Sequence, residues 1–527
     1  MIKIGIKCSI KRKKAVHVVI NTRTMAAVLI TVLLFQGGLM AKPQSGKQPN
    51  LLFIFPDQYR QYAMSFWSQP QYQKHRVGAP DPVKTPHIDK LAEEGIVFSR
   101  AVSNYPLCSP YRGMLLSGQY PEKNGIWMNC RKDRADALRQ DAQCVTDVFY
   151  EAGYNTAYFG KCHWHRTDPL FDQAHNFVGI TEAPGGHYTN PYDTYVPPGK
   201  SRHSIEYFYQ TLRDSHFDPI CYSNIAETVG GKKDGQAHLP KRYTPELESE
   251  CVIDYLRNKQ GQRAENKPFC LLWALNPPHN PWDKENCDLE SYERDYKGKS
   301  LDKLLQRENA DHAAGDYAPF YFANVDGVDR YVGKVLDVLE TEGLADNTIV
   351  VFTSDHGEML GSHGKQGKVV IQRESFSIPF IIRWPKCLQH RVEDLLISVP
   401  DVLPTLLGLA GLETQIPAEV EGTNYARLLV SPEAQVQKPK SALYLAGQGG
   451  RGVYTGRYTL SVSRDRETNT FDSFIYDNEK DPYQKTKIPL AKRPKVSEEL
   501  LKELAQWLKK TNDPWYQKKM AQSLIPY

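Results

Sequence analysis

The sequence Pro49-Asn-Leu-Leu-Phe-Ile-Phe-Pro-Asp57-Gln58 joins an unbroken apolar run to an acid and an amide. The run 51–55 has the length and composition of a strand that is buried on both faces, as in the parallel sheets of α/β proteins. The proline after it ends the strand, so Asp57 and Gln58 are expected at its carboxyl end. Loops at that end of a parallel strand are where α/β proteins place their chemistry.

The alternation of helix and strand continues along the chain as far as residue 385. Apolar residues recur at helical spacing or in short continuous runs, and Thr85-Pro86 and Gly95 mark the two ends of one helix. The patterns predict helices at 86–94, 145–152 and 325–339, and strands at 96–98, 156–159, 269–275 and 348–352. We therefore expect one large α/β unit, with a large mixed, mostly parallel sheet flanked by helices.

Two regions depart from this alternation. Residues 165–260 are rich in Tyr, His, Pro and Gly and show little periodicity, so we expect a long insertion in a main domain that spans 48–430. The composition changes near 431–440, and short strand-like runs then precede an amphipathic helix at 500–508. Residues 440–527 are thus expected to form a smaller C-terminal α+β subdomain.

The first 41 residues differ in charge from the rest. Residues 1–24 carry seven lysines and arginines and no acid, and residues 25–41 are uncharged and include a short apolar run. This pattern predicts a signal peptide over residues 1–41 and export to the periplasm or the extracellular space, since the run is too short for a stable membrane span. The net charge of the whole chain is +5, so the remainder carries −2. It lacks the cationic excess that nucleic-acid binding needs, and no nucleic-acid partner is expected.

Nine of the ten cysteines follow residue 41, at uneven spacings and without a CxxC pair. This pattern excludes a zinc ribbon. A chain of this size forms its core without disulfides, although one or two bridges would be compatible with export.

The segment Cys108-Ser-Pro-Tyr-Arg112-Gly carries the strongest chemical signal. Ser109 can cap a short helix with Pro110 at its first position and Gly118 at its end, which leaves Cys108 at the helix N-terminus. Backbone N–H groups and the helix dipole favour an anion there. The segment resembles the signature Cys-x-Pro-x-Arg of the sulfatases, in which a formylglycine-generating maturation enzyme oxidises the cysteine to formylglycine.

The resemblance to the sulfatases extends beyond this signature. Residues 48–385 resemble the sulfatase branch of the alkaline phosphatase superfamily, and residues 440–511 resemble its C-terminal subdomain. The resemblance implies an alkaline phosphatase-like fold and an enzyme that hydrolyses a sulfate monoester.

Two acid-containing segments, Asp57-Gln58 and Thr353-Ser-Asp355-His356-Gly, follow predicted strands. Hard divalent cations prefer oxygen ligands at such strand ends. The resemblance implies that these four side chains and residue 108 bind one divalent metal, expected to be calcium. The family more often has Asp where Gln58 stands and Asn where His356 stands. The two differences remove one negative charge and add a softer nitrogen ligand.

Three further segments supply cationic side chains: Gly160-Lys161-Cys-His163, Pro277-Pro278-His279-Asn-Pro281 and Gly367-Lys368. They occur in the family's order and resemble its Gly-Lys-Trp-His segment, its Pro-His-x-Pro turn and its sulfate-binding lysine. The resemblance implies that Arg112 and Lys161 hold the nucleophile and the sulfate oxygens, and that Lys368 clamps the sulfate. It also implies that His279 protonates the leaving oxygen and that His163 accepts a proton from the nucleophile.

A sulfate monoester surrounds its sulfur with anionic oxygens, so attack requires that charge to be neutralised and the leaving alkoxide to be protonated. A pocket dense in cations meets this requirement. The resemblance implies that a hydrated aldehyde at position 108, acidified by the metal, attacks sulfur and that its second hydroxyl then expels sulfate by elimination. A serine ester would instead need water to attack a sulfate ester a second time.

Two other functions stay open. A phosphomonoesterase or phosphodiesterase of the same superfamily would share much of this site, although such relatives commonly use Ser or Thr and two metals. A chain whose Cys108 never matures would be a non-catalytic glycan-binding protein. The partner is expected to be a sulfated small molecule or a glycan, and Tyr188, Tyr192 and Tyr195 could stack on sugar rings.

Overall fold

The structure is a computed structural model that describes residues 48–131, 134–166, 193–212, 216–447, 449–465, 467–520 and 524. The described residues all belong to one compact unit, Lys47–Tyr527. The predicted signal peptide, Tyr188 and Tyr192 lie outside the described residues. Within the described part of the chain, no helix is both long enough and apolar enough to cross a bilayer.

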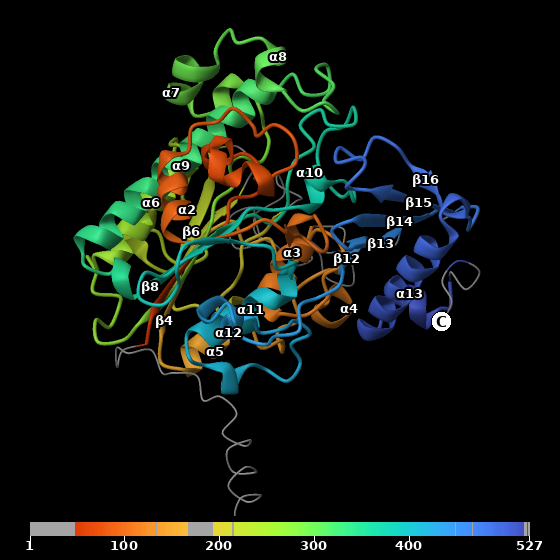
Figure 1. The fold of residues 1–527 in the computed structure, drawn as a ribbon. Coiled ribbons are helices and arrows are strands. Elements are labelled where there is room, and N and C mark those ends of the chain that lie inside the picture. The colour runs from red at the N-terminus through yellow and green to blue at the C-terminus, as the bar shows by residue number, and fades with distance from the viewer. Residues whose placement is uncertain are drawn as a thin grey trace, which may run out of the picture. The chain divides into compact units, whose positions relative to one another are not determined.

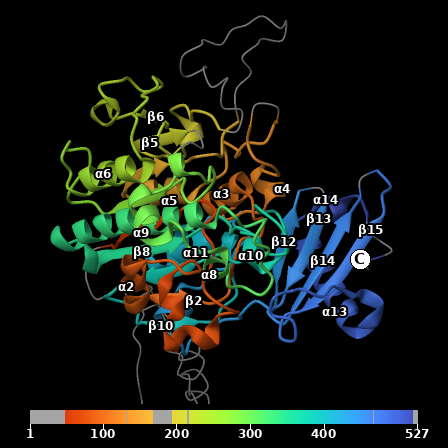
Figure 2. The same ribbon diagram turned by 90° about the horizontal axis from the view of Figure 1, so that it is seen from above.

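A nine-stranded sheet organises the larger unit (Figures 1 and 2). The strands lie in the order β10-β2-β9-β8-β1-β7-β4-β5-β6, and of these nine only β9 and β6 run antiparallel to their neighbours. The predicted large, mostly parallel sheet is therefore confirmed. The strands are β1 Asn50–Ile54, β2 Ile96–Phe98, β4 Asn155–Gly160, β5 Tyr207–Leu212, β6 Ile220–Ser223, β7 Phe269–Ala274, β8 Thr348–Thr353, β9 Phe380–Arg383 and β10 Arg391–Glu393, and a separate parallel pair is β3 Ala101–Val102 with β11 Ile397–Ser398.

Helices cover both faces of this sheet (Figure 1). The helices α2, α6 and α9 pack together on one face, and α3, α5 and α11 pack on the other. The helices are α2 Pro86–Glu94, α3 Cys108–Ser117, α4 Pro121–Asn124, α5 Val145–Glu151, α6 Thr244–Leu256, α7 Leu289–Ser291, α8 Leu301–Leu304, α9 Ala318–Thr341, α10 Arg373–Phe376, α11 Val399–Leu409, α12 Ala426–Val430, α13 Pro494–Lys510 and α14 Pro514–Gln517. The central strands are thus buried on both sides, which explains why their sequences are continuously apolar.

The apolar core on one face of the sheet is formed by alternate residues of the central strands and by the helices that cover them. Leu52 and Ile54 of β1 share an apolar cluster with Trp273 of β7 and Phe352 of β8, and side chains of α2, α6 and α9 complete it. All five residues of β1 are buried, so Leu51 and Phe53, which alternate with Leu52 and Ile54, face the opposite helix layer. The predicted elements from 51–55 to 348–352 are all present, and the helix expected at 325–339 is longer, at 24 residues.

The C-terminal subdomain is a five-stranded antiparallel sheet with α13 against it (Figure 2). Its strands are β12 Ala442–Ala446, β13 Gly450–Tyr454, β14 Tyr458–Arg464, β15 Phe471–Asp477 and β16 Ile488–Pro489. Leu500, Leu504 and Leu508 form the buried stripe of α13, as the amphipathic pattern predicts. The subdomain joins the larger sheet region through Asn104, whose Nδ2 donates to the carbonyl of Leu443 at 2.9 Å.

The region 165–260, which is expected to be an insertion, contains regular secondary structure. Its described part supplies β5, β6 and α6, and β5 pairs in parallel with β4 of the main sheet. The polar Gln210 interrupts the apolar pattern of β5, but its side chain is buried and bonded to the main chain of Thr194 and Val196. Tyr195 is also buried, and its hydroxyl donates to Asp234 at 2.8 Å. Tyr195 is therefore a packing residue and does not offer its ring to a sugar.

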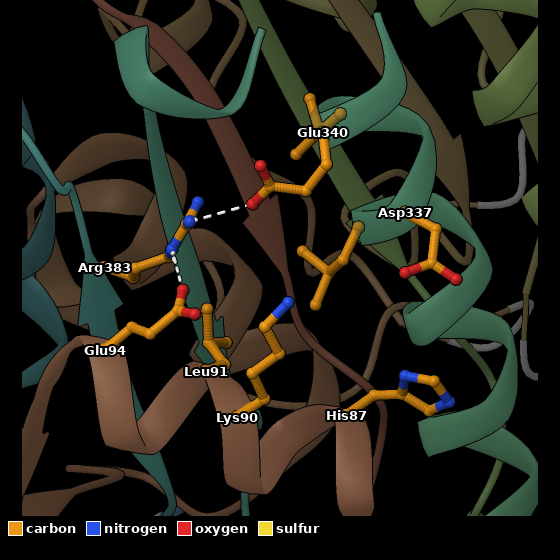
Figure 3. A pocket seen from close by; sticks show the side chains of 9 residues that line it. His87, Lys90, Leu91, Glu94, Asp337, Glu340 and Arg383 are labelled. Atoms are coloured by element: carbon orange, nitrogen blue, oxygen red, sulfur yellow. Dashed lines mark hydrogen bonds and ion pairs between the residues drawn. The ribbon is translucent and has the colours of Figure 1, made fainter. Parts of the chain in front are cut away.

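Arg383 ties the antiparallel strand β9 to two helices (Figure 3). Its guanidinium donates to Glu94 of α2 at 2.7 Å and to Glu340 of α9 at 2.9 Å. The small pocket around these side chains contains none of the predicted site residues. These ion pairs hold β9 beside β8, one of the strands from which the site is built.

Candidate active site

The predicted site residues gather at one edge of the sheet. The strands β8, β1, β7 and β4 are adjacent and parallel, so their carboxyl ends meet. Each is followed directly by site residues: Asp355 and His356 after β8, Asp57 and Gln58 after β1, His279 after β7, and Lys161 and His163 after β4. Segments far apart in sequence therefore converge as the strand-end argument predicts.

Cys108 lies at the first position of α3, with its side chain against two of the expected metal ligands. Its Sγ is 3.6 Å from an Asp57 oxygen and 3.4 Å from His356 Nε2. The helix begins two residues before the predicted first helical residue, Pro110, and Leu107 stands at the N-cap. Ser109 is not the cap, because its hydroxyl accepts a hydrogen bond from the Cys130 main chain at 3.0 Å.

Gly118 ends α3 as predicted. Its φ of 66° is in the left-handed region, which a glycine adopts without strain, and its N–H donates to the carbonyl of Met114. All ten residues of α3 are buried. The helix is thus fixed at both ends, and position 108 is fixed with it.

Arg112 lies one turn along α3, beneath the carboxylates. Its side chain is 1% exposed and lies 3.1 Å from Asp57 Oδ2 and 3.5 Å from Asp355 Oδ2. It also donates to the carbonyl of Lys161 at 2.5 Å, and the guanidinium stacks over the ring of Phe55. Among the described residues it does not line the cavity, so it contacts the ligand-bearing loops and not the open side of the site.

Two lysines face the carboxylates from the open side. Lys161 Nζ is 3.0 Å from Asp57 Oδ2 and donates to Asn276 at 3.3 Å. Lys368 Nζ donates to the side-chain oxygen of Gln58 at 2.7 Å and lies 3.4 Å from Cys108 Sγ. Both lysines line the same cavity, so their charges are available to an anion that enters it.

The two predicted acid–base histidines also line this cavity. His163 Nε2 is 3.1 Å from the carbonyl of Cys130, so this nitrogen carries the proton and donates. His279 Nδ1 donates in the same way to the carbonyl of Asn280 at 2.9 Å. In each ring one nitrogen is committed to the main chain, which fixes the orientation of the other.

Charge coupling shifts the pKa values at the centre of the site. Burial and Asp57 would raise the pKa of the Cys108 thiol, but Lys368 and Lys161 outweigh them and hold it well below the usual range. Burial would also raise the pKa of Asp57, and Lys161 and other cations keep it well below its ordinary value. Asp355 differs, because burial and then Asp57 raise its pKa to about 6. We conclude that Asp57 stays ionised to lower pH than Asp355, which loses its charge as the pH falls through about 6.

The donor set suits a divalent cation. Asp57, Cys108, Asp355 and His356 are buried, and each has a potential ligand atom within 4.8 Å of those of the others. Asp355 Oδ2 is buried and has no hydrogen-bond partner among the described residues, although the Arg112 guanidinium lies 3.5 Å away. A buried carboxylate oxygen without a donor is costly unless a cation compensates it. The residues present therefore fit a metal ion.

The cavity in front of Cys108 has a volume of about 480 Å³. It is lined by several side chains that the sequence patterns do not single out: Asn129, Asp193, Asn280, Trp282 and Gln366. Trp282 stacks on Tyr317 with ring centroids 4.1 Å apart, so its ring is held in place. Asn280 and Trp282 follow His279 directly, and that proximity is the only sequence signal that would have indicated them.

Comparisons with known proteins identify the family of this chain. Residues 49–412 match the profile of the sulfatase family, and residues 361–513 match the profile described as N-sulphoglucosamine sulphohydrolase, C-terminal. An endo-4-O-sulfatase of Bacteroides thetaiotaomicron is 39% identical over 506 residues, which cover 92% of this chain and 96% of that protein. An ulvan-active sulfatase of Formosa agariphila is 28% identical over 456 residues, which cover 84% of this chain and 77% of that protein.

The fold comparison gives the same result. A solved structure from work on the metabolism of multiple glycosaminoglycans by Bacteroides thetaiotaomicron has a TM-score of 0.84 and 39% identity, and the match covers 91% of this chain and 100% of the solved chain. The family profile covers most of this sequence, from the first strand to beyond α11. The chain belongs to the sulfatase family and is a sulfuric ester hydrolase.

Proposed function

We propose that this chain hydrolyses a sulfate monoester on a carbohydrate, with residue 108 converted to formylglycine and one divalent cation, Ca²⁺, bound beside it. The observation that carries the proposal is the position of Cys108, at the start of α3 and within 3.6 Å of Asp57, His356 and Lys368. Formylglycine at this position would supply a hydrated aldehyde as the nucleophile. A cation held by Asp57, Gln58, Asp355, His356 and residue 108 would supply fixed positive charge beside the sulfate oxygens.

Lys368 and Lys161 are the side chains that bind the sulfate group. Each has its ammonium group in the cavity and near a carboxylate or amide oxygen, which holds the long side chain in one orientation. A sulfate group that binds between the two lysines exchanges its hydration shell for two charged donors. These donors are already in position and do not have to reorganise during the reaction. Arg112 acts from beneath, by fixing Asp57 and the main chain of Lys161.

The two histidines divide the proton transfers. His279 Nδ1 donates to a carbonyl, so the acid form of His279 is the imidazolium, and the proton delivered to the leaving oxygen is the one on Nε2. His163 is committed through Nε2, and its buried Nδ1 has no hydrogen-bond partner among the described residues. That nitrogen is the one that accepts a proton from the nucleophile when sulfate is released.

A carbohydrate substrate is supported by the cavity wall and by the relatives. The ring of Trp282 offers an apolar face, while Asn129, Asn280 and Asp193 offer hydrogen-bonding groups, a combination that suits a sugar. The relative at 39% identity is an endo-4-O-sulfatase, so 4-O-sulfated glycosaminoglycan oligosaccharides are the first substrates to test. Oligosaccharide substrates of increasing length would distinguish removal of internal sulfate groups from removal of terminal ones.

The test compares the matured enzyme on an aryl sulfate and on the matching aryl phosphate. We expect kcat/KM to be higher for the sulfate by roughly a hundredfold or more, and a Cys108→Ala variant to be inactive on both. Intact-mass analysis of the peptide that contains residue 108 must show the aldehyde form. Faster phosphate turnover would support a phosphatase, and a persistent thiol in the native host would support a non-catalytic glycan-binding protein.

We also propose that the protein is exported, to the periplasm or the extracellular space, and is matured by a formylglycine-generating enzyme. The basic residues 1–24 and the uncharged residues 25–41 support export. The N-terminal sequence of the protein recovered from a periplasmic or culture fraction tests this proposal. Recovery only from the cytoplasm, with residues 1–41 retained, would contradict it.

A further inference from the structure

Glu358 is a buried carboxylate directly behind the site, and it takes no part in the proposed reaction. It follows the proposed ligand His356 by two residues, is fully buried, and is absent from the lining of the cavity. One of its oxygens accepts hydrogen bonds from Tyr317, from the N–H of Leu360 at 3.1 Å and from the N–H of Gly367 at 2.7 Å. The other oxygen accepts from the side-chain amide of Gln58.

The amide of Gln58 is oriented from both of its ends. Its Nε2 donates to the Glu358 carboxylate, which can only accept, and its Oε1 accepts from the Lys368 ammonium, which can only donate. Both neighbours therefore require the same orientation. As a result the oxygen of Gln58, and not its NH₂ group, faces Lys368 and the proposed cation site.

We propose that Glu358 is a positioning residue for cation binding, which acts through Gln58. It holds the Gln58 oxygen toward the cation. It also supplies a negative charge behind the Gln58 amide, in place of the charge that an Asp or Glu at position 58 would supply directly. The inference rests on the cation site put forward under the proposed function. It explains how a neutral side chain occupies a position where Asp is more common in the family.

The same carboxylate also links the cation site to the sulfate-binding side of the cavity. Glu358 accepts a hydrogen bond from the N–H of Gly367, the residue before Lys368. The N–H of Met359 donates to the Gly367 carbonyl at 2.9 Å. Its third donor, Tyr317, supports the ring of Trp282 in the cavity wall. Glu358 thus contacts the supports of the cation, of the sulfate-binding lysine and of the cavity wall.

The variant Glu358→Gln tests the donor and acceptor pattern without changing the size of the side chain. The two backbone N–H groups keep the new amide oxygen on their side, so its NH₂ group must face Gln58. Gln58 then has to turn its oxygen toward residue 358 and its NH₂ group toward Lys368 and the cation. We expect the affinity for Ca²⁺ to fall by at least about tenfold, the range typical of lost outer-shell partners of metal ligands.

The charge swap Gln58→Glu with Glu358→Gln provides the rescue. The double variant keeps the net charge of the pair, and the Gln at 358 donates to a carboxylate at 58 whose second oxygen faces Lys368. We expect it to bind Ca²⁺ within about threefold of the unmodified enzyme. The single variant Gln58→Glu places two carboxylates against each other and should not show this recovery.

The measurement is calorimetric titration of Ca²⁺ into the full-length mature enzyme after chelation, with thermal unfolding of the cation-free proteins to confirm that each variant folds. Glu248→Gln is the matched control, because it changes another buried carboxylate that lies outside the cavity, and its affinity should stay within about twofold. A variant that does not fold is replaced by Gln58→Ala. In that background, adding Glu358→Gln should cause no further loss if Glu358 acts through Gln58.

Three outcomes overturn the inference. They are a Ca²⁺ affinity of Glu358→Gln within about twofold of the unmodified enzyme, no recovery of affinity in the charge swap, and a further loss of about tenfold when Glu358→Gln is added to Gln58→Ala. If the unmodified enzyme itself binds no divalent cation, the proposed cation site fails, and this inference fails with it. Turnover of the aryl sulfate by the same samples separates that result from a loss of the proposed activity.

Discussion

At the scale of single residues, the two histidines of the cavity are distinguished by which nitrogen the main chain holds. His279→Ala removes the proposed acid, so turnover should fall by roughly 10²–10⁴-fold for an alkyl or sugar sulfate and far less for 4-nitrophenyl sulfate, whose leaving group needs no proton. His163→Ala should lower kcat for both esters alike, because it acts after the alcohol has left. Steady-state kinetics on the two esters measures the difference.

The exposed His312, outside the cavity, provides the control for these variants, and His312→Ala should leave both rates unchanged. Equal losses on the two esters after His279→Ala would contradict its assignment as the acid. If the loss of turnover after His163→Ala is much larger for the sugar sulfate than for 4-nitrophenyl sulfate, His163 is the acid and the two assignments must be exchanged.

At the scale of secondary-structure elements, Glu248 of α6 is bonded to the two strands that α6 covers. Its carboxyl group accepts from Thr211 of β5 at 2.8 Å and from the indole of Trp273 of β7 at 3.0 Å. Burial raises its pKa from 4.5 to about 7. Between these values the folded protein keeps a proton that the unfolded chain releases, so its contribution to stability is present below about pH 4.5 and is lost as the pH rises toward 7.

Glu248→Gln should therefore remove this pH dependence. The amide keeps an acceptor for Trp273 and a donor for Thr211, and it cannot ionise. Relative to the unmodified protein, the variant should gain up to about 3 kcal/mol of stability between pH 5 and pH 8, as expected from the size of the pKa shift. Thermal or urea unfolding at the two pH values measures it, and an unchanged stability difference between the two proteins would contradict the shift.

The same elements show what the sequence can and cannot predict. The strands β1, β7 and β8 were predictable because burial on both faces makes their sequences continuously apolar. The strand β5 was not, since Gln210 is polar and only its tertiary partners reveal that it is buried. The start of α3 was placed two residues late, because Ser109 suits a cap and only the structure shows that its hydroxyl accepts a hydrogen bond from Cys130.

The candidate site was predictable to the extent that its residues follow strand ends. The resemblance supplied the residue types, and the parallel order of β8, β1, β7 and β4 explains why those residues meet. Glu358 and Asp193 were not predictable, because their importance lies in contacts with residues distant in the sequence. No periodicity or local motif encodes such contacts.

The C-terminal subdomain supports the loop that carries the sulfate-binding lysine. Tyr444 of β12 is buried, and its hydroxyl donates to the carbonyl of Val369 at 2.9 Å. Val369 directly follows Lys368 and has a φ of 69°, which a β-branched residue adopts only when its surroundings impose it. The hydrogen bond from the subdomain is one of the contacts that impose it. Lys368 therefore depends on both parts of the described fold.

Tyr444→Phe tests this dependence, because it removes one hydroxyl and keeps the ring that packs on Phe376. The Val369 carbonyl loses its donor, the strained loop relaxes, and Lys368 moves away from the sulfate position, so kcat/KM for the aryl sulfate should fall by roughly tenfold. The cost in stability should be only about 1 kcal/mol, as for one hydrogen bond. Tyr454→Phe, in the same apolar cluster, is the matched control and should keep its activity. If Tyr444→Phe loses stability but keeps kcat/KM, the subdomain contributes to folding alone and Lys368 is held by the Gly367 and Gln58 contacts without it.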